Sequence, residues 1–421
     1  MSGNTLNMKA NGFESIVLGF TLFTLGGASR LLTASNIPNF ILGVIGWYYI
    51  LKGFISTKGS IQSNLPPNYR LLLKFYLLLC LIMIARGYMV DYKMPWISTQ
   101  GMINFHIFDK YYMLPYLMPL VCWIPWQCYK FDKFTKYASW VAIASLIIFV
   151  IFFRSILASS IAARTGQDFD FSESGVQFRL YAPFAFAVLL VAYLTPKIWR
   201  RNMLGILTLI LINMIAGRRG SSLTSVILFM AAIYFWYKNK EHRYGQATGL
   251  IYKAFILLLL AGAIYFVLNS YWFDYLFLRG MQDNRSNVDE ALMSQMNDWQ
   301  LIFGKGLNGR YYFPITQIDY WEGWRFGSET GFYNLVLKGG YLLAFTYIVL
   351  LLIPAYKGMF KSSNMLCKAG GFFIFVSVLE LYPFGWLEFS IKFLVIWMMV
   401  VLCMSPKVRR MSNREIQKQF F

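Results

Sequence analysis

The chain has 421 residues, of which 57% are hydrophobic and only 14% are charged, and its mean hydropathy is +0.49. Soluble domains carry about 25% charged residues, so this composition excludes an ordinary soluble protein and indicates a polytopic membrane protein. The formal net charge is +20. In a membrane protein such an excess follows from basic loops on one side of the bilayer, so we expect no nucleic-acid partner.

The apolar segments begin near residue 13, and the residues before them lack the basic region and cleavage site of a signal peptide. Runs close to the roughly 20 residues that cross a bilayer then recur along the chain. We predict an all-α polytopic membrane protein in which residues 1–421 form a single integral membrane domain with about twelve transmembrane helices. The predicted helices cover residues 13–32, 37–55, 71–88, 111–126, 137–158, 180–195, 202–217, 221–237, 251–271, 331–354, 369–386 and 388–404.

Lysine and arginine gather in alternate loops between these predicted helices. Basic residues mark the cytoplasmic side of membrane proteins, so this alternation predicts that both termini are cytoplasmic. An even number of helices agrees with that orientation. The predicted inner loops contain Lys52 and Lys58; Lys130, Lys133 and Lys136; Lys197, Arg200 and Arg201; Lys238, Lys240 and Arg243; and Lys357, Lys361 and Lys368.

The five cysteines fall in predicted helices or inner loops, so neither a disulfide framework nor a zinc site is expected. The predicted outer loops carry no cluster of histidines and carboxylates at metal-ligand spacing, and we therefore expect no bound metal and no cofactor. The cysteines are Cys80, Cys122, Cys128, Cys367 and Cys403.

The longest polar segment, residues 270–330, joins the ninth and tenth predicted helices on the outer side. A connection of this length is uncommon unless it has a function, and we expect it to form part of an active site. It is rich in tryptophan and tyrosine, which suit either the membrane interface or the face of a sugar ring. Both interpretations remain open at this stage.

Two arginines, Arg218 and Arg219, lie in the sequence AGRRGSSL, where two predicted helices meet at the outer face. Guanidinium groups match the geometry of phosphate oxygens, and the start of the following helix adds backbone N–H donors. Positive charge on the outer side also runs against the usual orientation rule. We therefore favour a phosphate-binding role over simple contact of these side chains with the membrane interface.

Four more arginines occur in the long loop: Arg279, Arg285, Arg310 and Arg325. A helix around Arg285 would place it at salt-bridging distance from Asp289, which is the structural alternative to a binding role. Arg310 lies in the segment IFGKGLNGRYYF, where it follows three glycines that include Gly304 and Gly306. Glycine most often serves a turn, so this motif is weak evidence on its own.

Glu329 begins the segment ETGFYNLVLKGG at the mouth of the predicted helix 331–354. A carboxylate that is partly removed from water can act as a general base toward a sugar hydroxyl, and Tyr333 in the same segment is a candidate substrate contact. The structural alternative is a carboxylate that interacts with the helix dipole. Ionisable residues inside predicted helices, including Glu380 and Lys392, need partners and are expected to be structural or to line a cavity.

Three pieces in this order resemble the superfamily of O-antigen polymerases and O-antigen ligases: AGRRGSSL, FGKGLNG and ETGFYNLVLKGGYLLAF. The resemblance covers about residues 200–355. Ligases of this superfamily usually begin the last motif with a histidine ten residues before a glycine in the helix; here Glu329 stands ten residues before Gly339. The polymerase branch is therefore the better fit.

The resemblance implies a GT-C-like membrane glycosyltransferase in the bacterial inner membrane, acting without a metal in surface-polysaccharide biosynthesis. Its partner would be an oligosaccharide linked to undecaprenyl diphosphate, with a chain-length regulator protein as a possible second partner. Arg219 and Arg285 resemble the two diphosphate-binding arginines, with Arg218 and Arg279 as their rivals. Glu329 takes the place of the ligase histidine, while Arg310, Arg325, Gly304, Gly306 and Tyr333 are expected near the substrate.

Two other functions stay open at the level of sequence. One is the ligase, which joins finished polymer to an acceptor. The other is a transporter or flippase of lipid-linked sugars, for which broken helices near the middle of the bilayer and internal repeats would be expected. No internal repeat stands out in this chain.

Overall fold

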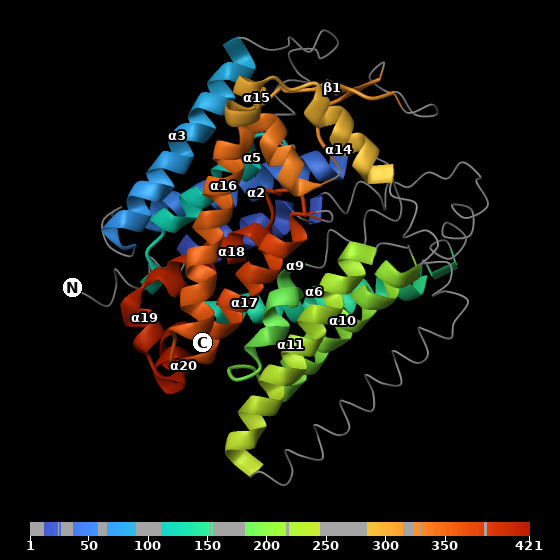
Figure 1. The fold of residues 1–421 in the computed structure, drawn as a ribbon. Helices are drawn as coiled ribbons and strands as arrows, with labels where there is room; N and C mark the ends of the chain where they lie inside the picture. Colours follow the sequence, from blue (N-terminus) through green and yellow to red (C-terminus); the bar gives the residue numbers. More distant parts are fainter. Residues whose placement is uncertain are drawn as a thin grey trace.

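Helices dominate the part of the chain that the structure describes (Figure 1). The computed structural model describes residues 12–23, 25–26, 37–57, 65–89, 111–151, 153–154, 182–215, 219–244, 284–314, 323–328, 330–382 and 385–421. Within these ranges the only strands are β1 (Tyr311–Tyr312) and β2 (Trp324–Arg325), which pair antiparallel. The predicted helical class is confirmed at this level.

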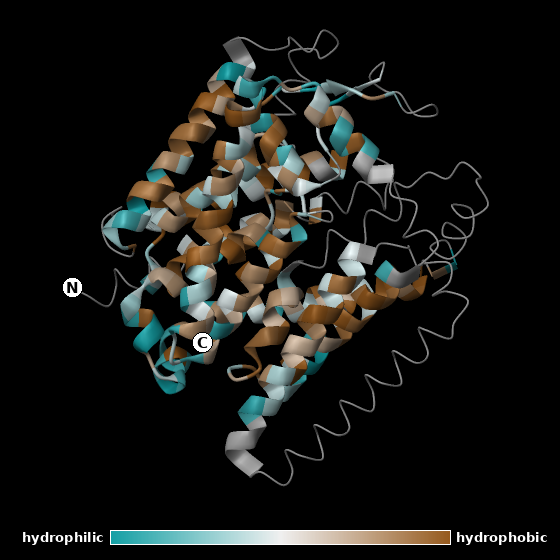
Figure 2. Ribbon diagram, in the orientation of Figure 1, coloured by the Kyte–Doolittle hydropathy of each residue, from teal (hydrophilic) through white to brown (hydrophobic). Residues whose placement is uncertain are grey.

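Five of the described helices are long and apolar enough to cross a bilayer, which agrees with the prediction of a membrane protein. They carry exposed apolar side chains, and hydrophobic residues predominate along the ribbons of helices such as α3 (Figure 2). Each coincides with a helix predicted from the sequence, whereas the total of twelve stays a prediction. The five are α2 (Ile37–Thr57), α3 (Pro67–Met89), α6 (Phe131–Ile151), α11 (Arg219–Tyr244) and α16 (Gly331–Phe360).

Three further helices complete the centre of the bundle: α10 (Pro196–Ile215), α17 (Met365–Glu380) and α18 (Ile391–Met404). α10 packs between α6 and α11, while α16 and α17 pack against each other and against α18 (Figure 1). Every side chain of α18 except that of Lys392 is buried. Thus α18 forms the core, and the helices around it carry the exposed apolar surface.

Two predicted membrane helices are not continuous. The segment 111–126 consists of α5 (Leu114–Leu117) and the 3₁₀ helix η2 (Met118–Trp123), followed by η3 (Trp126–Cys128). Pro115, Pro119 and Pro125 explain the interruption, because proline removes a backbone donor and clashes with the preceding turn.

The segment 180–195 consists of α9 (Ala182–Ala187) and η4 (Val188–Leu190) and ends before α10. Its side chains at 184–190 are buried in the protein. The apolar side chains of this segment therefore pack in the protein core, and its crossing of the membrane stays a prediction. The predicted helix 251–271 lies outside the described residues.

The C-terminal helices α19 (Pro406–Arg410) and α20 (Asn413–Phe420) pack back onto the bundle. Ile416 and Phe420 are buried, and the Phe420 ring lies 5.9 Å from that of Trp126. The backbone N–H and hydroxyl of Ser412 donate hydrogen bonds to Glu415, and these bonds lower the pKa of that exposed carboxyl. A reciprocal capping box thus starts α20.

The described part of the long loop is structured and lies at one end of the bundle (Figure 1). It contains α14 (Asn284–Ser294) and α15 (Asp298–Phe303), followed by residues 304–310 and the β1–β2 pair. α15 packs on α16, and α14 contacts β1. This arrangement brings the loop motifs to the start of α16.

Candidate functional site

The helix α16 is broken at Gly340, one residue after the glycine of the predicted motif. Gly340 has a φ of 72°, and a Cβ at this position would collide with the carbonyl of Ile302. The break exposes two carbonyls of the preceding turn, which accept hydrogen bonds from the backbone N–H groups of Lys305 (2.7 Å, to Leu337) and Gly306 (3.0 Å, to Lys338). The helix is thereby capped by another segment of the chain.

The segment that caps it, residues 304–310, is called the glycine-rich loop below. Gly304 and Gly306 both have positive φ angles, 74° and 83°, which favour glycine. A Cβ on Gly304 would also collide with the carbonyl of Lys338. These glycines therefore have a structural role in packing the loop onto α16. Their predicted contact with substrate stays a prediction.

The same loop is fastened to the end of α3. The backbone N–H of Leu307 donates to the carbonyl of Met83 (3.1 Å), and the Asn308 side-chain amide donates to the carbonyl of Gly87 (2.8 Å). In the reverse direction, the Arg86 guanidinium donates to the carbonyl of Phe303 (2.9 Å). The loop thus joins two helices that are more than 200 residues apart in sequence.

Two buried lysines hold the end of the glycine-rich loop. The Lys338 ammonium donates to the carbonyl of Gly309 (2.9 Å), and the Lys305 ammonium donates to that of Arg310 (3.1 Å). Both lysines are buried. An ammonium in such a place needs hydrogen-bond acceptors to offset its lost hydration, and here backbone carbonyls supply them. The sequence analysis did not identify these lysines, since they belong to no charged cluster.

Arg310 and Arg325, both predicted to lie near the substrate, are brought to one β-hairpin. Tyr311 pairs with Arg325, and Tyr312 pairs with Trp324. The Arg310 guanidinium lies 4.5 Å from the centre of the Trp324 ring, a distance typical of a cation–π contact. The two arginines therefore share one small platform of aromatic side chains.

The hairpin is also tied to α14. The Gln295 side chain donates to the carbonyl of Tyr312 and accepts from the backbone N–H of the same residue, both at 2.8 Å. Because Gln295 immediately follows α14, these two bonds fix the end of that helix beside β1. The backbone of Arg285, which is predicted to bind diphosphate, belongs to α14. The Arg285 side chain lies outside the described part.

Asp289 connects α14 to the segment that begins α16. Its carboxylate accepts a hydrogen bond from the hydroxyl of Ser328 (2.7 Å) and a longer one from Thr330 (3.5 Å). These two residues flank Glu329, which lies outside the described residues. Asp289 lies one helical turn after Arg285 in α14. Its hydrogen bonds therefore hold the backbone of α14 beside Ser328 and Thr330, the two neighbours of Glu329.

The start of α16 is joined to the end of α17. The backbone N–H of Phe332 donates to the carbonyl of Leu381 (3.0 Å), and that of Gly385 donates to the carbonyl of Glu380 (2.6 Å). A Cβ on Gly331 would collide with the carbonyl of Gly385. Tyr333 is half-buried in the first turn of α16 and packs edge-on against Phe332.

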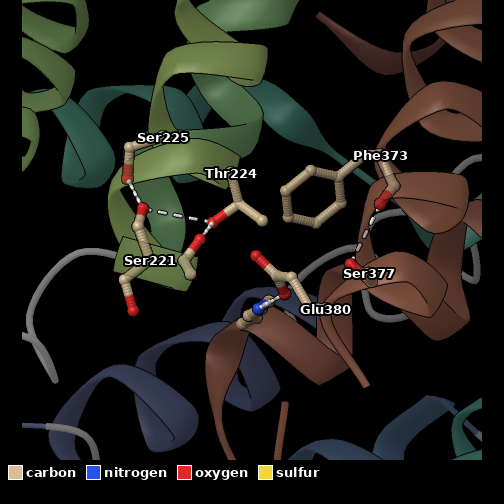
Figure 3. A network of polar contacts seen from close by, with 8 residues as sticks. Ser221, Thr224, Ser225, Phe373, Ser377 and Glu380 are labelled. Carbon is tan, nitrogen blue, oxygen red and sulfur yellow. Dashed lines mark hydrogen bonds and ion pairs between the residues drawn. The ribbon is translucent and has the colours of Figure 1, made fainter. Parts of the chain in front are cut away.

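A group of polar side chains, called the polar cluster below, lies between α17 and the first turns of α11 (Figure 3). The buried Glu380 carboxylate forms an ion pair with Lys392 of α18. Figure 3 shows this carboxylate facing the turn of α11 that follows the arginine pair. The cluster consists of Ser221, Thr224, Ser225, Ser377, Glu380 and Lys392.

Ser225 anchors the α11 side of the polar cluster. Its hydroxyl donates to the carbonyl of Ser221 (2.7 Å) and accepts from the Asn213 amide of α10 (3.3 Å). The backbone of Arg219 begins α11, whereas its side chain and all of Arg218 lie outside the described part, as does Arg279. The first turns of α11 pack beside α17, whose end is hydrogen-bonded to the start of α16.

Among the described residues no group of three or more histidine, cysteine or acidic side chains could hold a metal ion. None of the five cysteines forms a disulfide, and all five are buried. The expectation of metal-independent chemistry stays a prediction.

Comparisons with protein-family models, with curated proteins and with solved structures find no match to this chain.

Proposed function

We propose that this chain is a membrane glycosyltransferase of the surface-polysaccharide polymerase kind. It would transfer oligosaccharide units from undecaprenyl diphosphate onto one another at the outer face of a bacterial inner membrane. The strongest support is a set of hydrogen bonds that links α14 to the start of α16, and the start of α16 to the end of α17. The first turns of α11 lie opposite Glu380 at the end of α17 (Figure 3). Elements that carry or follow the three motifs thus pack in sequence, α11 on α17, α17 on α16 and α16 on α15, which supports the proposal.

In the proposed reaction, a hydroxyl oxygen of the acceptor sugar forms a bond to the anomeric carbon of the donor. The bond from that carbon to the diphosphate oxygen breaks, and the diphosphate leaves with the electron pair. Arg219 and Arg285 would stabilise the negative charge on the leaving group, with Arg218 and Arg279 as alternatives. Glu329 would accept the proton of the acceptor hydroxyl.

The described arginines, Arg310 and Arg325, would contribute a second layer of positive charge. Their β-hairpin is fixed to α14 by Gln295, and the glycine-rich loop that precedes it is fixed to α3 and α16. Such preorganised charge stabilises a transition state more effectively than charge that must be moved into place. Asp289 would act as a positioning residue for segment 328–330.

The experiment uses purified protein in liposomes with a lipid-diphosphate oligosaccharide and follows polymer ladders on a gel. We expect ladders with wild type and their loss in Glu329→Gln, Arg219→Ala and Arg285→Ala. Lys361→Met, a substitution of an exposed residue near the C-terminal end of α16, serves as a matched control that keeps activity. Ladders of normal length from Glu329→Gln would sink the proposal.

Three further measurements bear on the same proposal. Ladder formation should persist in excess chelator, because guanidinium groups take the place of a metal at the leaving group; abolished activity would exclude this chemistry. Cysteine labelling of the two ends from either side of sealed vesicles should place both termini in the cytoplasm. A pull-down with a chain-length regulator protein then asks whether that second partner binds.

A transporter of lipid-linked sugars is the second candidate, since α16 is a broken helix. However, the carbonyls exposed by the break at Gly340 are bound by backbone N–H groups of Lys305 and Gly306. They are therefore already satisfied and do not favour a transport site. A ligase would show one transfer per acceptor in place of a ladder, so the same gel separates all three functions.

A further inference from the structure

The short helix α15 has a strongly apolar exposed face. Its side chains Trp299, Ile302 and Phe303 are 72%, 46% and 39% exposed. At spacings of three and four residues they lie on one side of the helix, and the rings of Trp299 and Phe303 stack 5.8 Å apart. A soluble loop helix would not present three large apolar residues together to water.

This face continues the lipid-facing stripe of α3. Leu71, Phe75, Leu78 and Ile82 are exposed on α3 and follow each other at helical spacing, so they form one apolar stripe along this candidate membrane span. Arg86 extends the same stripe by one turn. Its guanidinium donates to the carbonyl of Phe303, the last residue of α15.

The length of α3 places this junction at the surface of the bilayer. The span Pro67–Gly87 contains 21 residues, which rise about 30 Å, the thickness of the hydrocarbon core. Arg86 and the α15 face would then lie where hydrocarbon gives way to lipid headgroups. Tryptophan and the long side chain of arginine are both favoured at this depth.

We propose that the face formed by Trp299, Ile302 and Phe303 docks onto the bilayer itself and enters the headgroup region beside the Arg86 end of α3. The occupant of this face is membrane lipid, because the face is continuous with the lipid-facing stripe of α3. α15 is then a membrane-surface helix inside what the sequence presents as an aqueous loop. The glycine-rich loop, which starts at the end of α15, is held at headgroup depth as a consequence.

The test attaches an environment-sensitive fluorophore to single cysteines introduced by Trp299→Cys and Ile302→Cys. The five native cysteines are buried, and unsubstituted protein measures any background labelling. Ser294→Cys, at the exposed end of α14, is the matched control outside the face. Each labelled protein is checked by gel filtration and placed in vesicles of phosphatidylethanolamine and phosphatidylglycerol.

Two quenchers then report what covers each position. For Trp299→Cys and Ile302→Cys we expect several-fold stronger quenching by a nitroxide on the upper acyl chain than by aqueous iodide, with the reverse order for Ser294→Cys. Equal access of iodide to all three positions would overturn the proposal in favour of a water-exposed face. Protection from both quenchers would also overturn it, because a protein, such as a second copy of this chain, would then cover the face. Neither outcome depends on glycosyl transfer.

Discussion

The glycine-rich loop and the polar cluster both bury hydrogen-bonding groups within the protein, yet they are held by different kinds of contact. The loop is bound mainly by backbone groups, with glycines at 304, 306 and 340 that allow close approach. The cluster contains one ion pair, Glu380 with Lys392, and hydroxyl groups that donate to carbonyls of their own helices. The stability of the glycine-rich loop should therefore be sensitive to substitutions that add atoms to its glycines. The stability of the polar cluster should be sensitive to substitutions that remove a charge.

The largest effect is expected from Gly340→Ala, which tests the close approach. The backbone of Gly340, with φ 72° and ψ 179°, lies in a region essentially restricted to glycine and costs a residue with a Cβ about 1–3 kcal/mol, and the collision with the Ile302 carbonyl adds about 1–3 kcal/mol. We expect a loss of roughly 4 kcal/mol in the free energy of unfolding, measured by titration with dodecyl sulfate in mixed micelles. Gly327→Ala is the control, since its Cβ would meet the side chains of Asn334 (3.1 Å) and Trp386 (3.5 Å) and no backbone carbonyl. Equal losses in both variants would contradict the comparison.

Lys392→Met tests the ion pair and should cost roughly 3 kcal/mol, because it leaves the Glu380 carboxylate buried without its partner. The double variant Glu380→Gln with Lys392→Met removes both charges and should recover most of this loss in the same titration. A double variant as unstable as Lys392→Met would show that the ion pair is not what holds the polar cluster together.

Lys338→Met asks how much a buried charge contributes to the glycine-rich loop. A hydrogen bond from a charged donor is worth about 1.5–3 kcal/mol, but removing the ammonium also relieves part of its burial cost. The expected net loss is roughly 1 kcal/mol by thermal or detergent unfolding. Lys361→Met, at an exposed lysine, should change stability by less than about 0.5 kcal/mol. If Lys338→Met lowered the free energy of unfolding as much as Lys392→Met does, the glycine-rich loop would depend on charge as strongly as the polar cluster. The two regions would then not differ in the way proposed.

The smallest effect is expected from Ser225→Ala on the α11 side of the polar cluster. This change removes a bond of 2.7 Å to Ser221 and the acceptor of the Asn213 amide, at a cost of about 1 kcal/mol or less. Thr224→Val is the control, because its hydroxyl makes only bonds of 3.2 Å within its own helix. If Thr224→Val were the more damaging of the two, the hydroxyl facing Glu380 would be the important one.

The five long apolar helices were predictable because an apolar run of about 20 residues is typical of a helix that crosses a bilayer. α2, α3, α6, α11 and α16 all coincide with predicted segments. Continuous helices were wrongly predicted at 111–126, where three prolines interrupt the helix, and at 180–195, where short helical pieces pack their apolar side chains in the protein core. Burial in protein and burial in lipid select the same residue types, so hydropathy alone cannot separate them.

The candidate site was only partly predictable. The motif positions of Arg310, Arg325 and the glycines were visible in the sequence, whereas the bond between Arg86 and Phe303 joins residues 217 positions apart and leaves no local signal. Asp289 was visible only as a possible salt-bridge partner of Arg285. Its role toward Ser328 and Thr330 depends on the packing of α14, which no short motif records.

The burial of α18 has a consequence for how the bundle is assembled in the membrane. Its 14 residues rise about 21 Å, and nearly every side chain is enclosed by helices that are synthesised earlier. Those helices must therefore leave an opening until α18 arrives from the insertion machinery. In this interval the surrounding helices have entered the bilayer and the surfaces that later enclose α18 are still uncovered. These surfaces would then be most accessible to chaperones and quality-control proteases.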